Sequence, residues 1–207
     1  MKDQRNHWNK YYSNKQGKLA EYQYDTWLEK YINLLKGKKV LDLGSGIGND
    51  SKILAEQGIC VHACDFSQEA LEILHENLPT VSCTCIDMTQ KFPFEDASFG
   101  AVVADLSLHY FTWEVTMGIV AEIARILTMD GVLMLRVNSM NDVEYGAGQG
   151  SELEKHLYMV KEKVKRFFTE EDLAKLLADW DIKYIEEYTN WRFERGKVMW
   201  EVCCVKK

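Results

Sequence analysis

The chain has 207 residues and a formal net charge of −7; 46% of the residues are hydrophobic and 28% are charged, which is typical of a soluble globular domain. No apolar run approaches the roughly 20 residues of a membrane span, and the first residues lack the apolar core of a signal peptide. Nonspecific nucleic-acid binding needs clustered Lys and Arg, which the acidic balance disfavours. We therefore expect a cytoplasmic protein without a membrane or nucleic-acid partner.

The N-terminal part is predicted to be a cap segment followed by a helix. Residues 1–17 are polar but contain Trp8, Tyr11 and Tyr12, which need apolar surroundings. These aromatic side chains either fold over an active site or dock the N-terminus on the core, and the sequence leaves both possibilities open. Apolar residues then recur with helical spacing over residues 18–36, which predicts an amphipathic helix.

A glycine turn follows the first predicted strand. Residues 40–43 have the pattern of a buried strand end, and Gly44, Gly46 and Gly48 precede a helix expected over residues 49–57. Glycine permits positive φ and lets a ligand approach the main chain closely. The spacing differs from the G-x-G-x-x-G of dinucleotide sites, because an asparagine occupies the third glycine position. It also lacks the Gly-Lys-Ser/Thr of a phosphate-binding loop.

Four aspartates end or follow the predicted strands. Asp42 precedes the glycine turn, and Asp65 ends the second strand. Asp87 follows the third strand, and Asp105 ends the fourth. The carboxyl ends of parallel strands meet at one edge, where ligands of open α/β sheets bind, and Asp65 stands where such sheets place the acid that binds ribose hydroxyls. Since a carboxylate beside a phosphate would repel it, Asp42 favours a ligand with a cationic end.

Strands and helices alternate through the middle of the chain, which predicts a parallel sheet built from right-handed βαβ units. Ser67 is predicted to cap one of the helices. Strands are expected at residues 59–64, 81–86, 99–105 and 131–137, helices at residues 68–77 and 113–127, and a turn at residues 128–130.

Two side chains near the same edge are candidates for chemistry. His109 follows the fourth strand, and a histidine with a pKa of about 6.5 can act as a base at neutral pH. Packing or substrate orientation is the alternative role for His109. Arg136 lies in the fifth strand and is expected close to the edge.

The C-terminal third contains a glycine-rich loop, an ambiguous segment and a closing hairpin. Residues 139–150 fit a lid or acceptor loop, with mere flexibility as the equal alternative. Residues 152–168 fit a hairpin or a helix. Thr169 is predicted to cap a helix that reaches residue 178, with Asp172 as its partner. Two alternating segments then predict an antiparallel hairpin at the C-terminus.

Neither the cysteines nor the basic residues point strongly to a further site. The six cysteines do not show the C-x₂-C spacing of a zinc site, so we expect reduced structural thiols and no metal. The basic residues over 155–166 alternate with glutamates at positions 152, 154, 162 and 170, which favours a solvated face. A binding patch for an anionic substrate is the alternative.

These landmarks resemble the class I S-adenosylmethionine-dependent methyltransferases, in particular the small-molecule type related to the tellurite and thiopurine enzymes. The match comprises residues 40–48, Asp65, residues 86–88 and residues 104–110, in the family's order. It is strong over residues 38–140 and looser at the ends. The chain has Asp-Gly-Val at residues 130–132, where the family more often has Pro-Gly-Gly.

The resemblance implies an α/β fold: a Rossmann-like, seven-stranded, mostly parallel sheet with helices on both faces and an antiparallel C-terminal hairpin. It implies S-adenosyl-L-methionine as cofactor and a small-molecule methyl acceptor, with Asp42 at the ammonium, Asp65 at the ribose, Asp87 at the adenine and Met88 on the ring. The cofactor contacts are expected from Asp42, Gly44, Ser45, Gly46, Gly48, Asp65, Phe66, Asp87, Met88, Asp105 and Leu106. Acceptor contacts are expected from Trp8, Tyr12 and Arg136, and catalytic contacts from His109 and Tyr110.

We expect one domain over residues 1–207, with a cap at 1–37, a cofactor-binding core at 38–140 and an acceptor region with the closing hairpin at 141–207. A monomer or a homodimer is compatible with the sequence. A module that binds the cofactor without chemistry is an alternative. A nicotinamide-dependent oxidoreductase is a weaker one, because the third glycine is missing. The sequence does not identify the acceptor.

Overall fold

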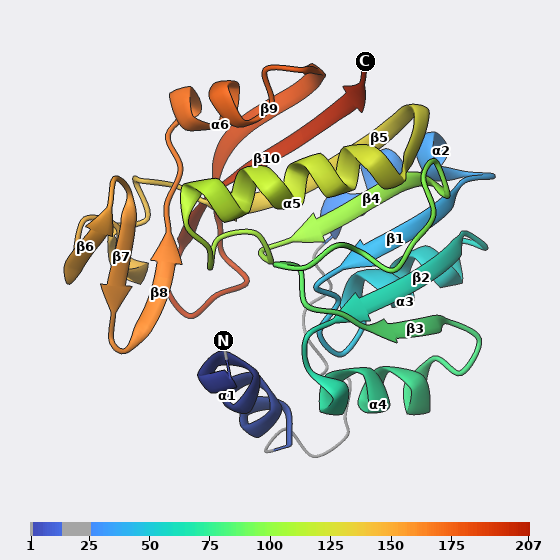
Figure 1. Cartoon of the computed structure of the whole chain (residues 1–207), viewed down its shortest axis with the longest axis horizontal. Helices are drawn as coiled ribbons and strands as arrows, with labels where there is room; N and C mark the ends of the chain where they lie inside the picture. Colours follow the sequence, from blue (N-terminus) through green and yellow to red (C-terminus); the bar gives the residue numbers. More distant parts are fainter. Residues whose placement is uncertain (1, 14–25) are drawn as a thin grey trace.

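The computed structural model describes residues 2–13 and 26–207, with side chains from residue 8 onward. Its main sheet has seven described strands in the order β3-β2-β1-β4-β5-β10-β9 (Figure 1). Neighbours from β3 to β5 pair in parallel, whereas β10 runs antiparallel to both β5 and β9. The strands are β1 (Lys39–Leu43), β2 (Cys60–Asp65), β3 (Ser82–Cys85), β4 (Phe99–Asp105), β5 (Leu127–Asn138), β9 (Trp180–Asn190) and β10 (Lys197–Lys206). The predicted fold class is confirmed.

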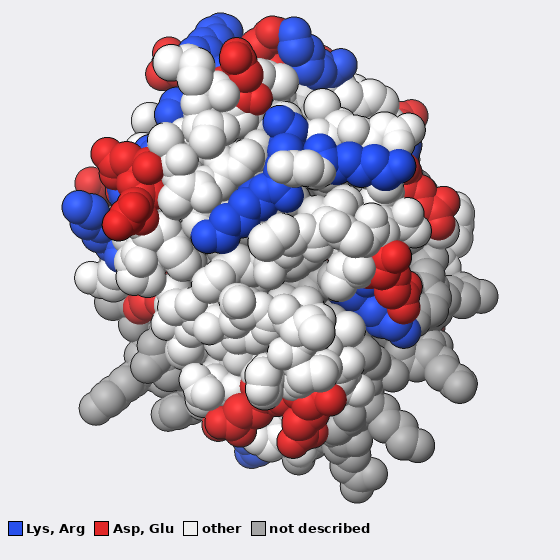
Figure 2. All heavy atoms as spheres, turned by 90° about the vertical axis from the view of Figure 1, so that its right-hand side faces the viewer, with Lys and Arg blue, Asp and Glu red and all other residues white. Residues whose placement is uncertain are grey.

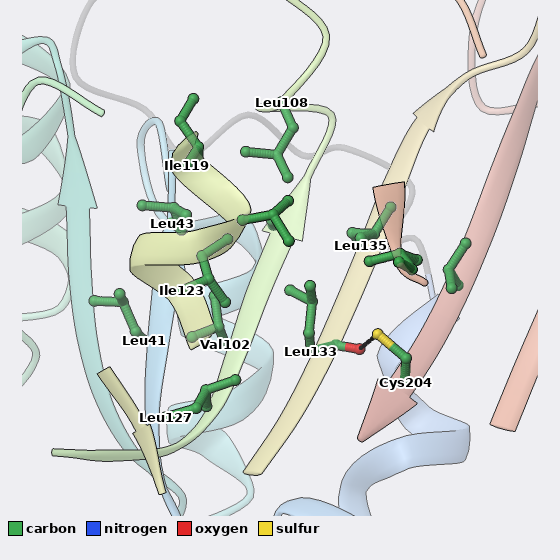
Figure 3. Packing of buried hydrophobic residues seen from close by; sticks show 14 of the residues in the cluster. Leu41, Leu43, Val102, Leu108, Ile119, Ile123, Leu127, Leu133, Leu135 and Cys204 are labelled. Atoms are coloured by element: carbon green, nitrogen blue, oxygen red, sulfur yellow. Dashed lines mark hydrogen bonds between the residues drawn. The ribbon is translucent and has the colours of Figure 1, made fainter. Parts of the chain in front are cut away.

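Helices cover both faces of the sheet, so the central strands are apolar on both sides. On one face, Ile119 and Ile123 pack on Leu41, Leu43 and strand β4 (Figure 3). The other face has its own buried cluster. The first face carries α5 (Trp113–Ile126) and α6 (Glu170–Leu176); the second carries η1 (Thr26–Tyr31), α2 (Ile32–Leu35), α3 (Asn49–Glu56) and α4 (Gln68–Asn77).

The predicted helix caps are present. Ser67 Oγ accepts from the Ala70 amide at 3.2 Å, which starts α4. Thr169 and Asp172 form a capping box at the start of α6. The side chains thereby satisfy backbone donors that have no partner within the first helical turn.

The fifth strand departs from its prediction. It begins at Leu127, so the expected turn at residues 128–130 does not separate it from α5. In the pairing with β4, Phe99 faces Leu127 and Ala101 faces Val132, so the turn residues form an irregularity within the ladder. Asp130 has a φ of 59°, as a turn residue would.

The N-terminal elements also differ from expectation. Residues 2–13 form α1 (Lys2–Ser13), which short-range periodicity does not signal. Of the predicted helix over residues 18–36, residues 18–25 lie outside the described part, and the rest is a 3₁₀ helix followed by one α-helical turn. Tertiary contacts hold this segment: Trp27 donates to Asp50, and Tyr31 donates to Glu201 at 2.6 Å.

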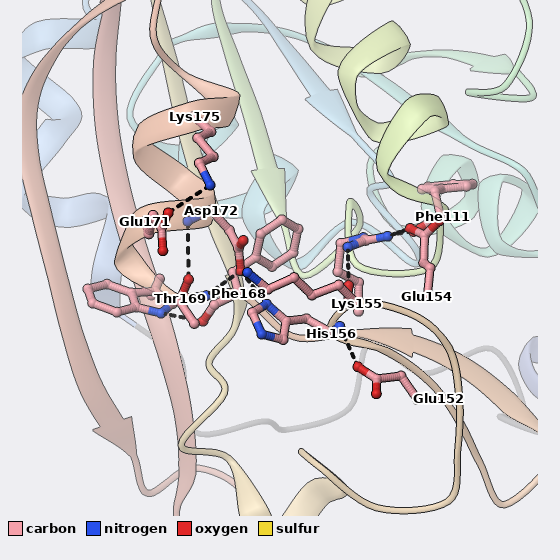
Figure 4. Close-up of polar contacts among 12 residues, drawn as sticks. Phe111, Glu152, Glu154, Lys155, His156, Phe168, Thr169, Glu171, Asp172 and Lys175 are labelled. Atoms are coloured by element: carbon pink, nitrogen blue, oxygen red, sulfur yellow. Dashed lines mark hydrogen bonds and ion pairs between the residues drawn. The ribbon is translucent and has the colours of Figure 1, made fainter.

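The ambiguous segment forms strands, as the hairpin alternative predicted. Its sheet consists of β6 (Ser151–Glu154), β7 (Leu157–Val160) and β8 (Lys163–Arg166), all antiparallel. Positive φ values at Lys161 and Glu162 make the tight turn between β7 and β8. His156 contacts Asp172 at 2.7 Å, which ties the small sheet to α6 (Figure 4).

The glycine-rich loop contains the short helix η2 (Val143–Tyr145). Among the described residues, no helix is long and apolar enough to cross a membrane. Figure 2 shows the edge at which the parallel strands begin, where basic side chains cross the upper half and acidic side chains lie around them. The charge on this edge is therefore mixed in sign.

Candidate functional site

A cavity of about 340 Å³ lies at the carboxyl ends of the parallel strands. This is the edge at which open α/β sheets bind ligands. The cavity is lined by Trp8, Tyr11, Tyr12, Asp42, Gly44, Ser45, Gly46, Ile47, Asn49, Asp50, Asp65, Phe66, Asp87, Met88, Thr89, Asp105, Leu106, Ser107, Tyr110, Phe111, Arg192 and Phe193. Most of the predicted site residues therefore meet in one place.

The glycine turn presents bare main chain to this cavity. Gly44 and Gly46 have φ values of 81° and 54°, which favour glycine. A β-carbon on Gly44 would lie 2.4 Å from the Ser107 β-carbon. A β-carbon on Gly48 would instead lie 2.7 Å from Leu74, so this glycine serves the packing between α3 and α4 and is not among the described lining residues.

Asp65 connects the turn to the next loop. Its carboxylate accepts from the Gly46 amide at 2.9 Å and from the Ser67 amide at 2.8 Å. Burial raises its pKa, although these hydrogen bonds oppose the increase. Each carboxylate oxygen has two lone-pair sites, so Asp65 retains acceptor capacity towards the cavity.

Two further carboxylates are buried beside the turn. Asp42 accepts from Ser51 Oγ at 2.6 Å, and burial, with repulsion from Asp105 and Asp65, raises the pKa of Asp42 to about 7. Asp50 also lines the cavity, and burial raises its pKa well above the ordinary value. The sequence analysis missed Asp50, because it lies in the first turn of a helix and not at a strand end.

Asp105 is held by a buried arginine. Arg136 forms two hydrogen bonds of 2.7 Å with the Asp105 carboxylate and stacks on Trp27, with the guanidinium carbon 4.4 Å from the ring centroid. Burial raises the pKa of Asp105, but Arg136 and Arg192 outweigh burial and lower it. Arg136 is fully buried, is not among the described lining residues and contacts Asp105, which itself lines the cavity.

The two predicted catalytic residues, His109 and Tyr110, differ in their position relative to the cavity. Tyr110 lines the cavity, whereas His109 is buried behind it, with 4.2 Å between the ring centroids. Burial, together with Lys197 and Lys165, lowers the pKa of His109 well below its ordinary value. His109 is thus not among the described lining residues, and this placement fits packing or orientation, the alternative role predicted for it.

Aromatic side chains from three segments form one wall. The Trp8 ring centroid lies 5.6 Å from that of Tyr110 and 6.0 Å from that of Tyr12, which brings the predicted N-terminal residues to the site. The loop between β9 and β10 adds Arg192 and Phe193. The sequence analysis missed these two, because a hairpin loop carries no local sign of which edge it faces.

The lining has the properties of a site for a cationic nucleoside. Five aspartates line the cavity, four from strands or the residues that follow them and Asp50 from the first turn of α3. Arg192 is the one basic residue among the described lining residues. Ser107 Oγ is buried and has no hydrogen-bond partner among the described residues, so it is available to bind a ligand in the cavity. The described residues contain no cluster of three or more potential metal ligands.

Comparison with known proteins shows which family the central part of the chain resembles. Residues 40–131 match the family model described as "Methyltransferase domain", which confirms the resemblance predicted from the sequence. Demethylmenaquinone methyltransferase from Paenarthrobacter aurescens is 39% identical over 72 residues, which is 35% of this chain and 28% of that protein. The tRNA N(3)-cytidine methyltransferase METTL2 of Gallus gallus is 24% identical over 186 residues, covering 83% of this chain and 50% of the relative. The matches thus span at most half of these two relatives.

A solved structure has a similar fold. The 1,6-didemethyltoxoflavin-N1-methyltransferase of Burkholderia thailandensis, with bound 1,6-didemethyltoxoflavin and S-adenosylhomocysteine, aligns with a TM-score of 0.72 and 20% identity. The alignment covers 98% of this chain and 87% of that one. The likeness therefore extends well beyond the central strands that match the family model.

Proposed function

Since residues 40–131 match the methyltransferase domain family, we propose that the chain binds S-adenosyl-L-methionine and transfers its methyl group to a small molecule. The observation that carries this proposal is the convergence of five aspartates and a bare glycine turn on one cavity. Clustered carboxylates repel one another and favour a cationic ligand, whereas a dinucleotide would add negative charge. When bound, the cofactor supplies an electrophilic methyl group on a positively charged sulfur.

Different lining residues would bind different parts of the cofactor. Asp65 would accept from the ribose hydroxyls, and Met88 with Asp87 would hold the adenine ring. The main chain at Gly44 and Gly46 would hold the methionine part, and the buried Asp42 would balance its ammonium. Phe66, Ser45, Leu106 and Asp105 complete the contacts on this side.

Catalysis comes from placement of the acceptor. The aromatic wall of Trp8, Tyr12 and Tyr110 would exclude water and restrict the position of the acceptor in the cavity. Orientation of two reactants can lower a barrier by about 7–11 kcal/mol in favourable cases. An acceptor that is already nucleophilic, such as a thiolate or a phenolate, needs no protein base, in keeping with the buried, neutral His109.

Titration calorimetry tests the cofactor assignment. We expect S-adenosylmethionine and S-adenosylhomocysteine to bind, and a nicotinamide dinucleotide not to bind. Asp65→Asn should weaken the binding of both S-adenosylmethionine and S-adenosylhomocysteine by about tenfold or more, because it removes a charged acceptor of hydrogen bonds. Asp179→Asn, at an exposed position, is the matched control. Absence of nucleoside binding by the unaltered chain would refute the proposal.

Formation of S-adenosylhomocysteine in the presence of candidate acceptors distinguishes an enzyme from a cofactor-binding module. The acceptors tested should include thiols, phenols, amines and chalcogen oxyanions. A tRNA arm belongs among them as well, because of the relative that is a tRNA methyltransferase. We propose that the protein is cytoplasmic and is a monomer or a homodimer. Sedimentation of the purified chain would measure its oligomeric state.

A further inference from the structure

The aromatic residues that line the cavity come from three segments of the chain. Trp8 lies on α1, Tyr110 and Phe111 follow β4, and Phe193 lies in the loop between β9 and β10. The ring of Trp8 meets that of Tyr110 at an interplanar angle of 75°, with 5.6 Å between the centroids. Flat rings pack on aromatic side chains face to face or edge to face, so this lining favours a planar occupant.

The rest of the lining is acidic. Five of the described lining residues are aspartates, whereas Arg192 is the one basic residue among them. The Arg192 guanidinium already lies 3.4 Å from the Asp105 carboxylate. The buried Arg136 donates two hydrogen bonds to the same carboxylate. Both guanidinium groups are therefore engaged with an acid of the lining.

The pKa values of two other carboxyls show that these arginines do not offset the negative charge of the lining. Burial, and then repulsion from Asp105 and Asp42, raise the pKa of Asp50 well above its ordinary value. Arg136 opposes this increase without cancelling it. Burial, with repulsion from Asp105 and Asp65, likewise raises the pKa of Asp42. A positive charge beside these carboxyls relieves their repulsion.

The charge of the acceptor decides how this lining acts during methyl transfer. S-adenosylmethionine has a cationic sulfur, whereas the sulfur of S-adenosylhomocysteine is neutral. Transfer to an anion, such as a thiolate, brings a further negative charge to the aspartates and then removes the positive one. Transfer to a neutral nucleophile moves the positive charge from sulfur to the acceptor, so that the carboxylates stabilise it throughout. The lining therefore favours a neutral acceptor.

The hydroxyl groups of the lining suit an acceptor that loses no proton. Burial, and then the neighbouring Tyr11 and two aspartates, raise the pKa of Tyr110, so its hydroxyl stays neutral at neutral pH. Ser107 is 8% exposed, and its Oγ has no hydrogen-bond partner among the described residues. Both hydroxyls can donate a hydrogen bond to a neutral polar atom, and neither is a base at neutral pH.

We propose that the methyl acceptor is a neutral aromatic nitrogen heterocycle, which lies against Trp8 and Tyr110 and takes the methyl group on a pyridine-type ring nitrogen. This inference rests on the proposed function and narrows its acceptor to one class. The nitrogen lone pair forms the new N–C bond, and the electron pair of the broken S–C bond stays on sulfur. No proton moves, and the product is a ring cation. Aromatic faces attract such a cation, and the lining carboxylates balance its charge.

Binding of small probes to the chain saturated with S-adenosylhomocysteine tests this. 1-Methylquinolinium represents the product, and 2-naphthoate is an anion of similar size and flatness. Tetraethylammonium is a cation without a flat ring. We expect 1-methylquinolinium to bind at least about tenfold more tightly than 2-naphthoate and more tightly than tetraethylammonium, as measured by titration calorimetry. If either of the other two probes bound as tightly as 1-methylquinolinium, the proposal would be overturned.

Matched variants locate the site of the probe. Tyr110→Leu should weaken 1-methylquinolinium by about fivefold, because the aromatic face is lost, whereas Tyr110→Phe should keep the affinity. Trp8→Leu should act as Tyr110→Leu does, and it serves if Tyr110→Leu does not fold. Trp191→Leu is the control, since Trp191 is 78% exposed and is not among the described lining residues. Unchanged binding in both Tyr110→Leu and Trp8→Leu would show that the assignment is wrong.

The products formed from different acceptors separate this inference from the proposed function. Methylation confined to thiols, phenols or chalcogen oxyanions would overturn the inference while it supports a methyltransferase. Loss of S-adenosylhomocysteine binding by the unaltered chain would instead disprove the proposed function.

Discussion

The hydroxyl of Tyr12 lies against the main chain of Gly46, so that a β-carbon on Gly46 would stand 2.7 Å from Tyr12 Oη. The N-terminal helix α1 thereby packs on the glycine turn, although strand β1 lies between the two residues in the sequence. Glycine at this position serves both the positive φ and the close approach of the tyrosine.

Gly46→Ala should therefore lower both stability and cofactor affinity. An alanine in the left-handed region costs about 1–2 kcal/mol, and its methyl group would also displace Tyr12. We expect about tenfold weaker binding of S-adenosylmethionine by calorimetry.

Gly118→Ala is the control for this change. Gly118 lies in helix α5, and a β-carbon there would meet no described atom within 4 Å beyond its own stretch of helix. Alanine is the better helix former, so this change should stabilise the chain by about 0.5–1 kcal/mol. Equal effects of the two changes would contradict the role given to Gly46.

Arg136→Met should be among the most destabilising single changes at the site. It leaves the Asp105 carboxylate without the two hydrogen bonds from this side chain, and breaking a buried pair from one side costs about 3–5 kcal/mol. Urea unfolding measures the loss. The double variant Asp105→Asn with Arg136→Met should recover part of it, because no unpaired buried charge remains.

The control for this prediction is the exposed pair of Lys175 and Glu171 on α6. Lys175→Gln should change the free energy of unfolding by less than about 1 kcal/mol, as is usual for exposed pairs. A loss at Arg136 no larger than the loss at Lys175 would show that the buried pair does not stabilise the fold.

The buried Asp42 should make cofactor binding release protons near neutral pH. Its pKa is raised to about 7 by burial and by its acidic neighbours, so at pH 7 a large fraction of the carboxyl is protonated in the free protein. A cationic ligand favours the ionised form and lowers this pKa. Affinity for S-adenosylmethionine should therefore rise between about pH 6 and 8. Calorimetry in buffers of different ionisation enthalpy counts the protons, and Asp42→Asn should reduce the count.

The raised pKa of Asp42 also makes the free energy of unfolding depend on pH. A raised folded pKa means that the folded state binds more protons than the unfolded state between about pH 4 and 7, so stability contributed at low pH is lost as pH rises through this window. Asp50 and Asp65 act in the same direction, since burial raises both of their pKa values. Asp42→Asn should flatten the dependence of the unfolding free energy on pH, and an unchanged slope would argue against a raised pKa.

The sequence predicts those parts of the site that depend on local patterns. A strand end followed by Gly44 or marked by Asp65 is visible in a few residues, because strand, turn and cap signals are short-ranged. The pair of Asp105 and Arg136 cannot be recognised in this way, because it joins two adjacent strands whose register the sequence does not give. Arg192 reaches the cavity only because β10 pairs antiparallel with β5, which turns its hairpin loop towards the carboxyl edge.

The last prediction concerns the N-terminal helix as a cover for the cofactor. Trp8 contacts Tyr110 and both neighbouring tyrosines, and it lines the cavity rather than the main core. Trp8→Ala should therefore speed dissociation of S-adenosylhomocysteine by about tenfold and change the free energy of unfolding by less than about 1 kcal/mol, because core residues lose no contact. Trp191→Ala is the matched control, since Trp191 is 78% exposed and is not among the described lining residues. Surface plasmon resonance gives the dissociation rates and urea unfolding the stabilities. If Trp8→Ala destabilised the fold strongly while leaving dissociation as in Trp191→Ala, the helix would be a structural element and not a cover.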